Sequence, residues 1–298
     1  MKVLWLGDID SRDPAHVGGK VANLSQLAAE YRVPPGFCLP ASVLDHASHG
    51  QFPSPLCRAL ADAYDALAAQ SGHAMPPVAV RSSAADEDGS TDSFAGQHAT
   101  YLNIRGMDAL VDAVQRCWAS ARTAQALDYR RQRGLATENI RLAVLIQHLI
   151  VADVSAVAFS TNPVTGNRNE IVINANWGLG ESIVGGLVTP DTYIADKLDL
   201  GRIKHQIAAK RRMTVAYGDG TREVDVPRSL CAKPALTVAQ VRAIAHLAQS
   251  LEQRMGWPVD VECAYRADHL YLLQCRPITT LAMPAMALPH EQPVVRAA

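Results

Sequence analysis

The chain has 298 residues, 48% of them hydrophobic and 19% charged, which is typical of a globular protein with a substantial buried core. Its net charge of −1, with acids and bases mixed along the chain, argues against binding to nucleic acid or an anionic membrane through bulk charge. No apolar run is long enough to span a membrane, and the N-terminus lacks the features of a signal peptide. The six cysteines form no C-x-x-C pair, so we expect reduced thiols in a cytoplasmic protein.

The first predicted helix begins beside two glycines and a lysine. Gly18-Gly19-Lys20 precedes apolar residues that recur at helical spacing as far as Tyr31. Because a helix N-terminus attracts phosphate, Lys20 is a candidate phosphate ligand, although a lysine taken alone is more often a surface residue. The sequence contains no Walker A loop, G-x-x-x-x-G-K-[ST].

The next elements are a helix, a buried strand and a loop. A helix is expected over 57–70, and after it the short apolar strand 78–80 ends at Arg81. An arginine at the end of a buried strand can contact a ligand or form a structural ion pair, and the sequence allows both. The stretch 86–96 is small, acidic and bounded by glycine, so we expect a mobile loop there, followed by one amphipathic helix over 107–133.

Three strands are predicted next, over 142–151, 155–160 and 170–175, with a glycine-rich loop after the last. Gln147 lies in the first of these strands among apolar residues, and it needs a hydrogen-bond partner if it is buried. That partner is either the edge of an adenine or a group in the core. For His148 beside it we expect a structural role.

After the glycine-rich loop the pattern weakens into short strands and turns, with a basic patch predicted at Lys210-Arg211-Arg212. Thr237 and Gln240 form the capping-box pattern of a helix that runs to Met255. Gly256 is placed to end this helix.

The last element is a predicted hairpin with strands 258–266 and 270–278, joined by a turn at Ala267-Asp268-His269. Because side chains alternate along a strand, one face of the hairpin is apolar and packs on the core. The residues expected on that face are Val261, Cys263, Tyr265, Tyr271, Leu273 and Cys275.

The opposite face of the hairpin gathers four polar residues. In this register Glu262 faces Gln274, and Asp260 faces Arg276. The side-chain oxygens of Glu262 and Gln274 suit Mg²⁺, which takes a few protein oxygens together with phosphate oxygens. Arg276 offers a fork for a phosphate. The alternative is a solvated face with an Asp260–Arg276 ion pair.

These segments belong to an ordered set of motifs that runs from about residue 18 to 280. The motifs are Gly18–Leu24, Val33–Phe37, Val80–Ala84, Ser93–Gln97, Tyr101–Asn103, Asn162-Pro163, Trp177–Glu181, Thr189–Asp191 and Leu273–Thr279. No single motif is decisive, but the ordered set resembles one family, the ATP-binding domain of phosphoenolpyruvate-utilising dikinases. Phosphoenolpyruvate synthase and rifampicin phosphotransferase are the nearest relatives in this resemblance, and pyruvate phosphate dikinase is more distant. Two departures, Ala156 for a frequent glycine and Cys263 for a common tryptophan, affect packing more than ligand binding.

The resemblance implies an α+β fold of the ATP-grasp type, in which two lobes hold a nucleotide between them. We expect the first lobe at 1–188, the second at 189–282 and a flexible tail at 283–298. By position the resemblance assigns Lys20, Arg81 and Arg276 to the phosphates and to catalysis, Gly96 and Thr100 to a covering loop, Gln147 to the adenine, Glu181 to the ATP site, and Glu262 and Gln274 to Mg²⁺.

The activity implied by the resemblance is cleavage of ATP to AMP, with the β-phosphoryl group passed to an acceptor and the γ-phosphate released. The relatives carry a swivelling domain with a phosphorylatable histidine, which has no counterpart in these 298 residues; His49 is the nearest imitation. We therefore expect a module that phosphorylates a separate histidine-bearing protein, as in a split dikinase. The alternatives are a kinase or activating enzyme for a small molecule, and a nucleotide-binding regulatory subunit without turnover.

Overall fold

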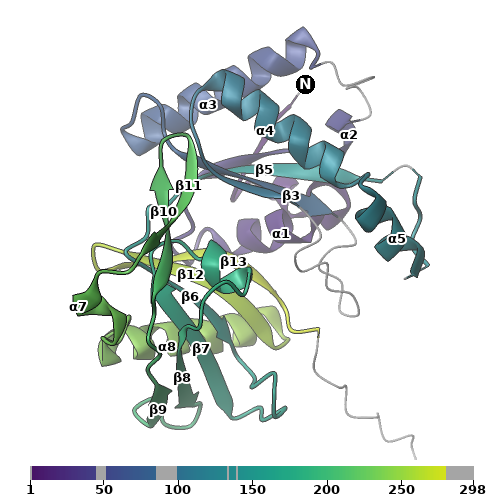
Figure 1. Ribbon diagram of the computed structural model, residues 1–298. Helices are drawn as coiled ribbons and strands as arrows, with labels where there is room; N and C mark the ends of the chain where they lie inside the picture. Colours follow the sequence, from purple (N-terminus) through teal and green to yellow (C-terminus); the bar gives the residue numbers. More distant parts are fainter. Residues whose placement is uncertain (1, 45–51, 85–98, 133, 139, 280–298) are drawn as a thin grey trace, which may run out of the picture.

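The structure is a computed structural model, and it describes residues 2–44, 52–84, 99–132, 134–138 and 140–279. Within these ranges the chain forms a five-stranded sheet, a six-stranded sheet and a separate two-stranded hairpin, with helices packed against them (Figure 1). Neighbouring strands are antiparallel, so the mixed helix and sheet content expected of the α+β class is confirmed. The predicted loop at 86–96 and the predicted tail at 283–298 lie outside the described residues.

The first sheet has the strand order β1-β2-β5-β3-β4. Its strands are β1 Leu4–Trp5, β2 Gly36–Leu39, β3 Val78–Ala84, β4 Thr100–Ile104 and β5 Leu142–His148. The central strand β5 is buried on both faces, which explains its nearly continuous apolar sequence. Leu142, Val144 and Ile146 pack into one apolar cluster, and Ala143 and Leu145 pack into another, because successive side chains point to opposite faces.

Helices cover both faces of the first sheet. They are η1 Ile9–Arg12, α1 Pro14–Leu27, α2 Ala41–Leu44, α3 Ser54–Ser71, α4 Met107–Ser120 and α5 Ala124–Gln132. α3 and α4 cover the face turned away from the second sheet, through residues such as Leu60 and Val114 (Figure 1). The single helix predicted over 107–133 is two helices, because the Thr123 hydroxyl accepts a hydrogen bond from Ala126 N and caps the start of α5.

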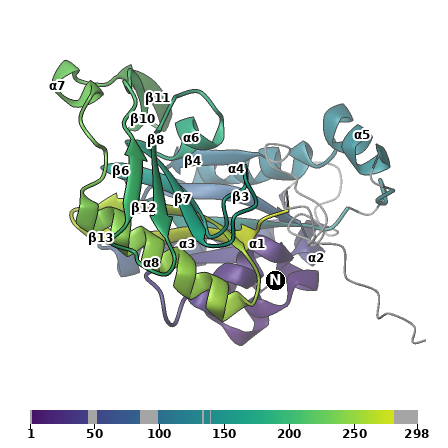
Figure 2. The same ribbon diagram turned by 90° about the horizontal axis from the view of Figure 1, so that it is seen from below.

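The second sheet has the strand order β13-β12-β6-β7-β8-β9. Its strands are β6 Val154–Phe159, β7 Glu170–Trp177, β8 Asp191–Asp196, β9 Ile203–Gln206, β12 Val259–Arg266 and β13 His269–Pro277. The helix α8, Val238–Met255, lies across this sheet with α1 beside it (Figure 2). The predicted capping box is confirmed, since Thr237 Oγ1 accepts from Gln240 N and Gln240 Oε1 accepts from Thr237 N. Gly256 ends the helix with φ of +79°.

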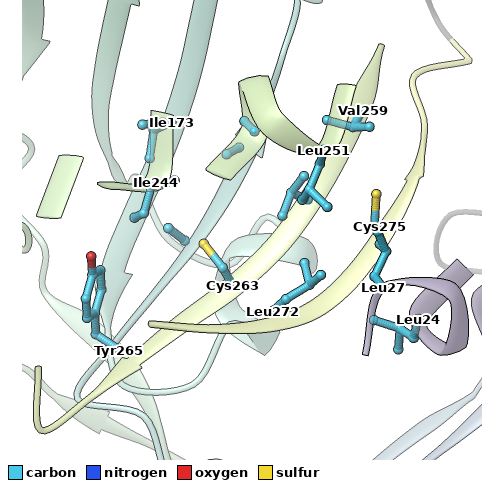
Figure 3. Packing of buried hydrophobic residues seen from close by; sticks show 14 of the residues in the cluster. Leu24, Leu27, Ile173, Ile244, Leu251, Val259, Cys263, Tyr265, Leu272 and Cys275 are labelled. Carbon is cyan, nitrogen blue, oxygen red and sulfur yellow. The ribbon is translucent and has the colours of Figure 1, made fainter. Parts of the chain in front are cut away.

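The core of the second sheet is shared with α1. Figure 3 shows Leu24 and Leu27 of α1 beside Leu272 and Cys275 of β13. The side-chain amide of Asn23 also donates a hydrogen bond of 3.1 Å to the Cys275 carbonyl. Because α1 packs on the first sheet as well, it is the apolar joint between the two sheets.

The chain passes from the first sheet to the second between β5 and β6, at residues 149–153. β6 and β7 precede residue 188, yet they pair with β12 and β8 in the second sheet. The chain therefore changes from the first sheet to the second at residues 149–153. The boundary that we expect between the lobes is at residue 188. An alternating pattern identifies a strand but not the strand that it pairs with.

The remaining elements lie between β7 and α8 in the chain, on either side of β8 and β9. They are α6 Glu181–Val184, the hairpin strands β10 Arg212–Tyr217 and β11 Gly220–Asp225, and α7 Arg228–Cys231. In Figure 1 the β10–β11 hairpin rises from the second sheet to the strands of the first. None of the helices in the described ranges combines the length and hydropathy needed to cross a membrane.

The prediction of a basic patch at residues 210–212 is wrong for Lys210. Its side chain is buried, and its Nζ lies 2.6 Å from Oδ1 of the equally buried Asp191. Asp191 also accepts hydrogen bonds from the backbone N–H groups of Ala208 and Ala235, so its charge is compensated on several sides. Arg212, by contrast, is exposed and forms ion pairs within its own hairpin.

We predict that Lys210→Met lowers the free energy of unfolding by about 3–5 kcal/mol, because it leaves the Asp191 carboxylate buried without its cation. Arg212→Met is the matched control, and it should cost less than about 1 kcal/mol, since exposed ion pairs contribute little. Urea denaturation of both variants measures these values. Equal, small losses in the two variants would contradict the role of the buried pair.

Candidate functional site

A cavity of about 280 Å³ lies between the two sheets. On one side it is lined by β3, β4 and β5, and on the other by β6, α6 and the β12–β13 hairpin. Eight of the nine candidate residues line it, namely Lys20, Arg81, Thr100, Gln147, Glu181, Glu262, Gln274 and Arg276. The ninth, Gly96, is outside the described residues. A volume close to 300 Å³ is at the lower end of the range for small-molecule sites.

Lys20 reaches the cavity because α1 is interrupted at Gly18, whose φ is +76°. A Cβ on Gly18 would lie 2.3 Å from the Ser83 hydroxyl oxygen and 2.4 Å from the Ser83 carbonyl oxygen, so only glycine allows this approach to β3. After the interruption, Val21 N donates to the Ser83 hydroxyl at 3.4 Å. Lys20 therefore lies in the first turn of the continuing helix, with its Nζ 3.5 Å from the Ser82 carbonyl oxygen.

Arg81 connects the two sheets across the cavity. Its Nη1 donates to the Leu273 carbonyl at 3.0 Å, and its Nη2 lies 2.8 Å from Glu262 Oε2. Both side chains are largely buried, with 13% of Arg81 and 16% of Glu262 exposed. The structural ion pair that the sequence allows for Arg81 is present, and its partner is the carboxylate predicted to bind a metal ion.

The β12–β13 hairpin differs from the prediction at its turn. The turn has two residues, Ala267 and Asp268, with φ of +45° and +63°, so Arg266 pairs with His269. The three-residue turn expected from the sequence is therefore wrong, and the pairs closest to the turn are shifted. The Asp153 carboxylate stabilises the turn by accepting from Ala267 N and pairing with Arg266.

A β-bulge restores the predicted register farther along the hairpin. The pairing shifts between Glu262 and Cys263, so that Glu262 faces Gln274 as predicted, and Asp260 faces Arg276. The bulge also changes which leucine enters the core: Leu272 is buried there, whereas Leu273, expected on the core face, lines the cavity.

Asp260 and Arg276 form the ion pair of the alternative weighed for this face, but the pair is partly buried and the face is not the solvated one that the alternative describes. Arg276 Nε and Nη2 lie 2.9 Å and 2.8 Å from Asp260 Oδ2. Burial raises the pKa of Asp260, and the nearby Glu262 raises it further, while Arg276 opposes both. The second carboxylate oxygen, Oδ1, is buried and has no hydrogen-bond partner among the described residues. Arg276 nevertheless lines the cavity as well.

The donor atoms at this end of the cavity fit a magnesium ion. Glu262 and Gln274 are paired across the hairpin and both line the cavity, so two oxygen donors converge there. The unpartnered Asp260 Oδ1 adds acceptor capacity on the same face of the hairpin. The described residues contain no group of three or more His, Cys, Asp or Glu side chains arranged around a metal site. These oxygen donors suit a hard cation that takes most of its ligands from phosphate oxygens and water. They do not suit zinc, which is bound mainly by cysteine and histidine side chains.

The other end of the cavity is apolar. Leu149 and Leu179 are buried in a small cluster between the sheets, and Leu102 packs against them. Gln147 is 2% exposed, and its Nε2 donates to the Pro34 carbonyl at 3.1 Å, which is the core hydrogen bond allowed by the sequence. His148 lines the cavity; burial lowers its pKa, and the nearby His73 ring lowers it further.

Glu181 is held at the cavity by a contact that the sequence analysis misses. Glu181 Oε2 accepts a hydrogen bond of 2.9 Å from the Thr221 hydroxyl on β11. The available signal is the pair Gly218-Asp219 between two alternating segments, which is typical of a two-residue hairpin turn. The pattern shows the hairpin but not which carboxylate it contacts.

Comparison with known proteins gives a consistent result. The family model described as "Pyruvate phosphate dikinase, AMP/ATP-binding domain" matches residues 42–292. Phosphoenolpyruvate synthase of Pyrococcus furiosus is 43% identical over 250 residues, which cover 80% of this chain and 30% of that protein. Rifampicin phosphotransferase of Streptomyces sviceus is 36% identical over 315 residues, covering 94% of this chain and 36% of that protein. The prodigiosin synthesizing transferase PigC of Serratia marcescens is also 36% identical, covering 96% and 34%.

The chain thus spans about a third of the length of these curated relatives. Among solved structures, D-alanyl-alanine synthetase A of Vibrio cholerae matches with a TM-score of 0.35 and 14% identity, covering 88% of this chain and 58% of that one.

Proposed function

Because the chain belongs to the family of pyruvate phosphate dikinase AMP/ATP-binding domains, we propose that its cavity binds Mg-ATP and that the protein is an ATP-dependent phosphotransferase of the ATP-grasp type. The observation that carries this proposal is the convergence of eight candidate residues on one cavity between the two sheets. These residues come from separate segments of the chain, so their meeting is a consequence of the fold and not of sequence proximity.

The two ends of the cavity suit the two ends of ATP. Lys20, Arg81 and Arg276 supply three positive charges at the end where the triphosphate would lie. The apolar walls formed by Leu149 and Leu179 suit the faces of an adenine ring, with Gln147 nearby. The proposal includes the ATP-grasp arrangement, in which the nucleotide lies between two lobes.

Binding of Mg-ATP would exchange the partners of two buried charges. The Arg81 guanidinium would contact phosphate oxygens in place of Glu262, and the Glu262 carboxylate would join Gln274 at the metal ion. Mg²⁺, when bound, supplies charge neutralisation for the phosphates. Lys20 and Arg276 would bind and orient the phosphates, and catalysis would come from positioning and from stabilising the charge that shifts among the phosphate oxygens.

The proposed reaction transfers the β-phosphoryl group to an acceptor. For a histidine acceptor, ATP, histidine and water give AMP, phosphohistidine and inorganic phosphate. None of the ten histidines in these 298 residues lies in a carrier motif, so a histidine acceptor would lie outside them, and the acceptor that we propose is a histidine-bearing partner, as in a split dikinase. A small-molecule acceptor is the second candidate, since two of the similar proteins are named rifampicin phosphotransferase and prodigiosin synthesizing transferase. A regulatory subunit without turnover would not require the paired metal donors Glu262 and Gln274.

We predict that Glu262→Ala and Gln274→Ala each abolish the gain in ATP affinity that Mg²⁺ produces in the wild type. Each variant loses an oxygen donor that lines the cavity. Glu262→Ala also removes the ion-pair partner of Arg81, which keeps its bond to the Leu273 carbonyl, so the variant should be less stable but folded. Titration calorimetry with ATP, in Mg²⁺ and in EDTA, measures the gain without any need for an acceptor. Glu223→Ala, which removes an exposed carboxylate, is the control. If Mg²⁺ raised the ATP affinity of both cavity variants as much as it raises that of the wild type, the metal assignment would be overturned.

Lys20→Ala and Arg81→Ala are expected to weaken ATP binding by roughly tenfold to a hundredfold, because each removes a charged donor to the phosphates. AMP binding should change by less than about threefold, since AMP lacks the β- and γ-phosphates that these residues would contact. Competition titrations against a fluorescent adenosine nucleotide compare the two ligands. Equal losses for ATP and AMP would show that the residues hold the fold or the base instead.

The acceptor is identified by product analysis. These 298 residues alone, given ATP and pyruvate, are expected to form no phosphoenolpyruvate, because they contain no histidine carrier motif. Addition of a histidine-bearing domain from a relative should yield AMP, inorganic phosphate and an acid-labile phosphohistidine on that domain. AMP release that depends on a metabolite, without protein phosphorylation, would favour the small-molecule acceptor. Phosphoenolpyruvate formed by this chain alone would contradict both.

A further inference from the structure

The β10–β11 hairpin bridges the two sheets beside the cavity (Figure 1). Its base is fixed to the second sheet, where Leu179 N donates to the Thr214 carbonyl at 2.8 Å. A Cβ on the neighbouring Gly178 would lie 2.3 Å from that carbonyl oxygen, so the approach requires glycine there. The same segment leads directly into α6, which carries Glu181.

The tip of the hairpin is held by Asn103 of β4, in the first sheet. The Asn103 side-chain amide donates to the carbonyls of Gly218 and Gly220, both at 2.8 Å, and its Oδ1 accepts from Arg105 Nε at 3.2 Å. Asn103 is 1% exposed and has φ of +60°, a conformation that asparagine tolerates better than most residues. Leu102, the residue before it, lines the cavity.

Thr221 follows Gly220 directly and connects the hairpin to the cavity. Its hydroxyl donates to Glu181 Oε2 at 2.9 Å. A carboxylate accepts hydrogen bonds at both oxygens, so a Glu181 fixed at Oε2 can present Oε1 to a donor. Anionic phosphates are repelled by this carboxylate, whereas the hydroxyl groups of a ribose and the amino group of an adenine are donors.

We propose that Thr221 and Asn103 are positioning residues for nucleoside recognition: Asn103 fixes the hairpin across the two sheets, and Thr221 orients the Glu181 carboxylate toward a hydrogen-bond donor of the nucleoside. This inference rests on the proposed function, because it assumes that the cavity takes a nucleotide. It assigns to the hairpin a role in selectivity that is distinct from phosphate and metal binding. It also makes nucleoside recognition depend on the two sheets being in contact.

The test compares Thr221→Val, which removes the hydroxyl at nearly constant shape, with Thr221→Ser, which keeps it. Dissociation constants are measured by titration calorimetry for ATP, 2′-deoxyATP, 3′-deoxyATP and ITP. We expect Thr221→Val to bind ATP about twofold to tenfold more weakly, the range of one hydrogen bond, and Thr221→Ser to bind like the wild type. The wild type should bind one of the analogues more weakly than it binds ATP, because that analogue lacks the donor that Glu181 contacts. For that analogue, Thr221→Val should have the same affinity as the wild type. A deoxy analogue identifies a ribose hydroxyl as the donor, and ITP identifies the adenine amino group.

Asn103→Asp tests the other end of the hairpin. Aspartate tolerates the same backbone conformation and still accepts from Arg105, but it no longer donates to Gly218 and Gly220. We expect the same selective loss as in Thr221→Val, and no additional loss when the two substitutions are combined. Glu223→Gln, on the same hairpin but outside this chain of contacts, is the control and should bind every nucleotide like the wild type.

Wild-type affinity of Thr221→Val for ATP, or an equal loss for ATP and every analogue, would overturn the positioning role. A wild type that does not distinguish ATP from any analogue would overturn it too. Failure of the wild type to bind ATP at all would overturn the proposed function, and the inference with it; the wild-type titration alone separates that case from the others.

Discussion

The position of α1 is the constraint on which both the fold and the cavity depend. Its leucines complete the core of the second sheet, and Asn23 bonds to β13. On the other side, Gly18 lets the helix approach β3 more closely than any side chain would permit. Because β3 carries Arg81 and β13 carries Arg276, one helix sets the separation of two cavity-lining cations and adds a third, Lys20. The arrangement of charges around the cavity is thus a consequence of how one helix packs between the two sheets.

A cavity lined by charges is stable before a ligand arrives only if those charges are compensated. Arg81 pairs with Glu262, and Arg276 pairs with Asp260, so neither guanidinium is left alone in a partly buried site. The same pairs connect the strands that line the cavity. Under the proposed function, phosphates and a divalent cation would replace the partners within the Arg81–Glu262 pair while keeping both charges compensated. Such an exchange avoids an intermediate with an uncompensated buried charge.

Local signals in the sequence predict the elements better than their partners. The capping box of α8 is confirmed, and Glu262 faces Gln274 as expected, although the bulge at Cys263 is needed to offset a turn one residue shorter than predicted. Burial of Lys210 could not be predicted, because its partner Asp191 lies 19 residues away at the start of β8. The contact of Thr221 with Glu181 spans 40 residues and depends on how the hairpin packs. Contacts of this kind are set by tertiary structure, which periodicity does not encode.

The contacts that bridge the two sheets are of two kinds, and they act in opposite directions on ligand binding. The Arg81–Glu262 pair connects the two sheets but would have to be broken for Mg-ATP to bind as proposed, so part of the ligand's interaction energy would replace it. The bonds from Asn103 to the hairpin tip involve groups that the proposed ligand contacts do not use, so they would remain when Mg-ATP binds. A ligand shifts the equilibrium between the state with the Arg81–Glu262 pair intact and the state with it broken only by binding one state more tightly than the other. Under the proposed function, the first contact therefore lowers the affinity for a ligand that lacks the phosphates or the cation, and the second would keep the sheets aligned while the exchange takes place.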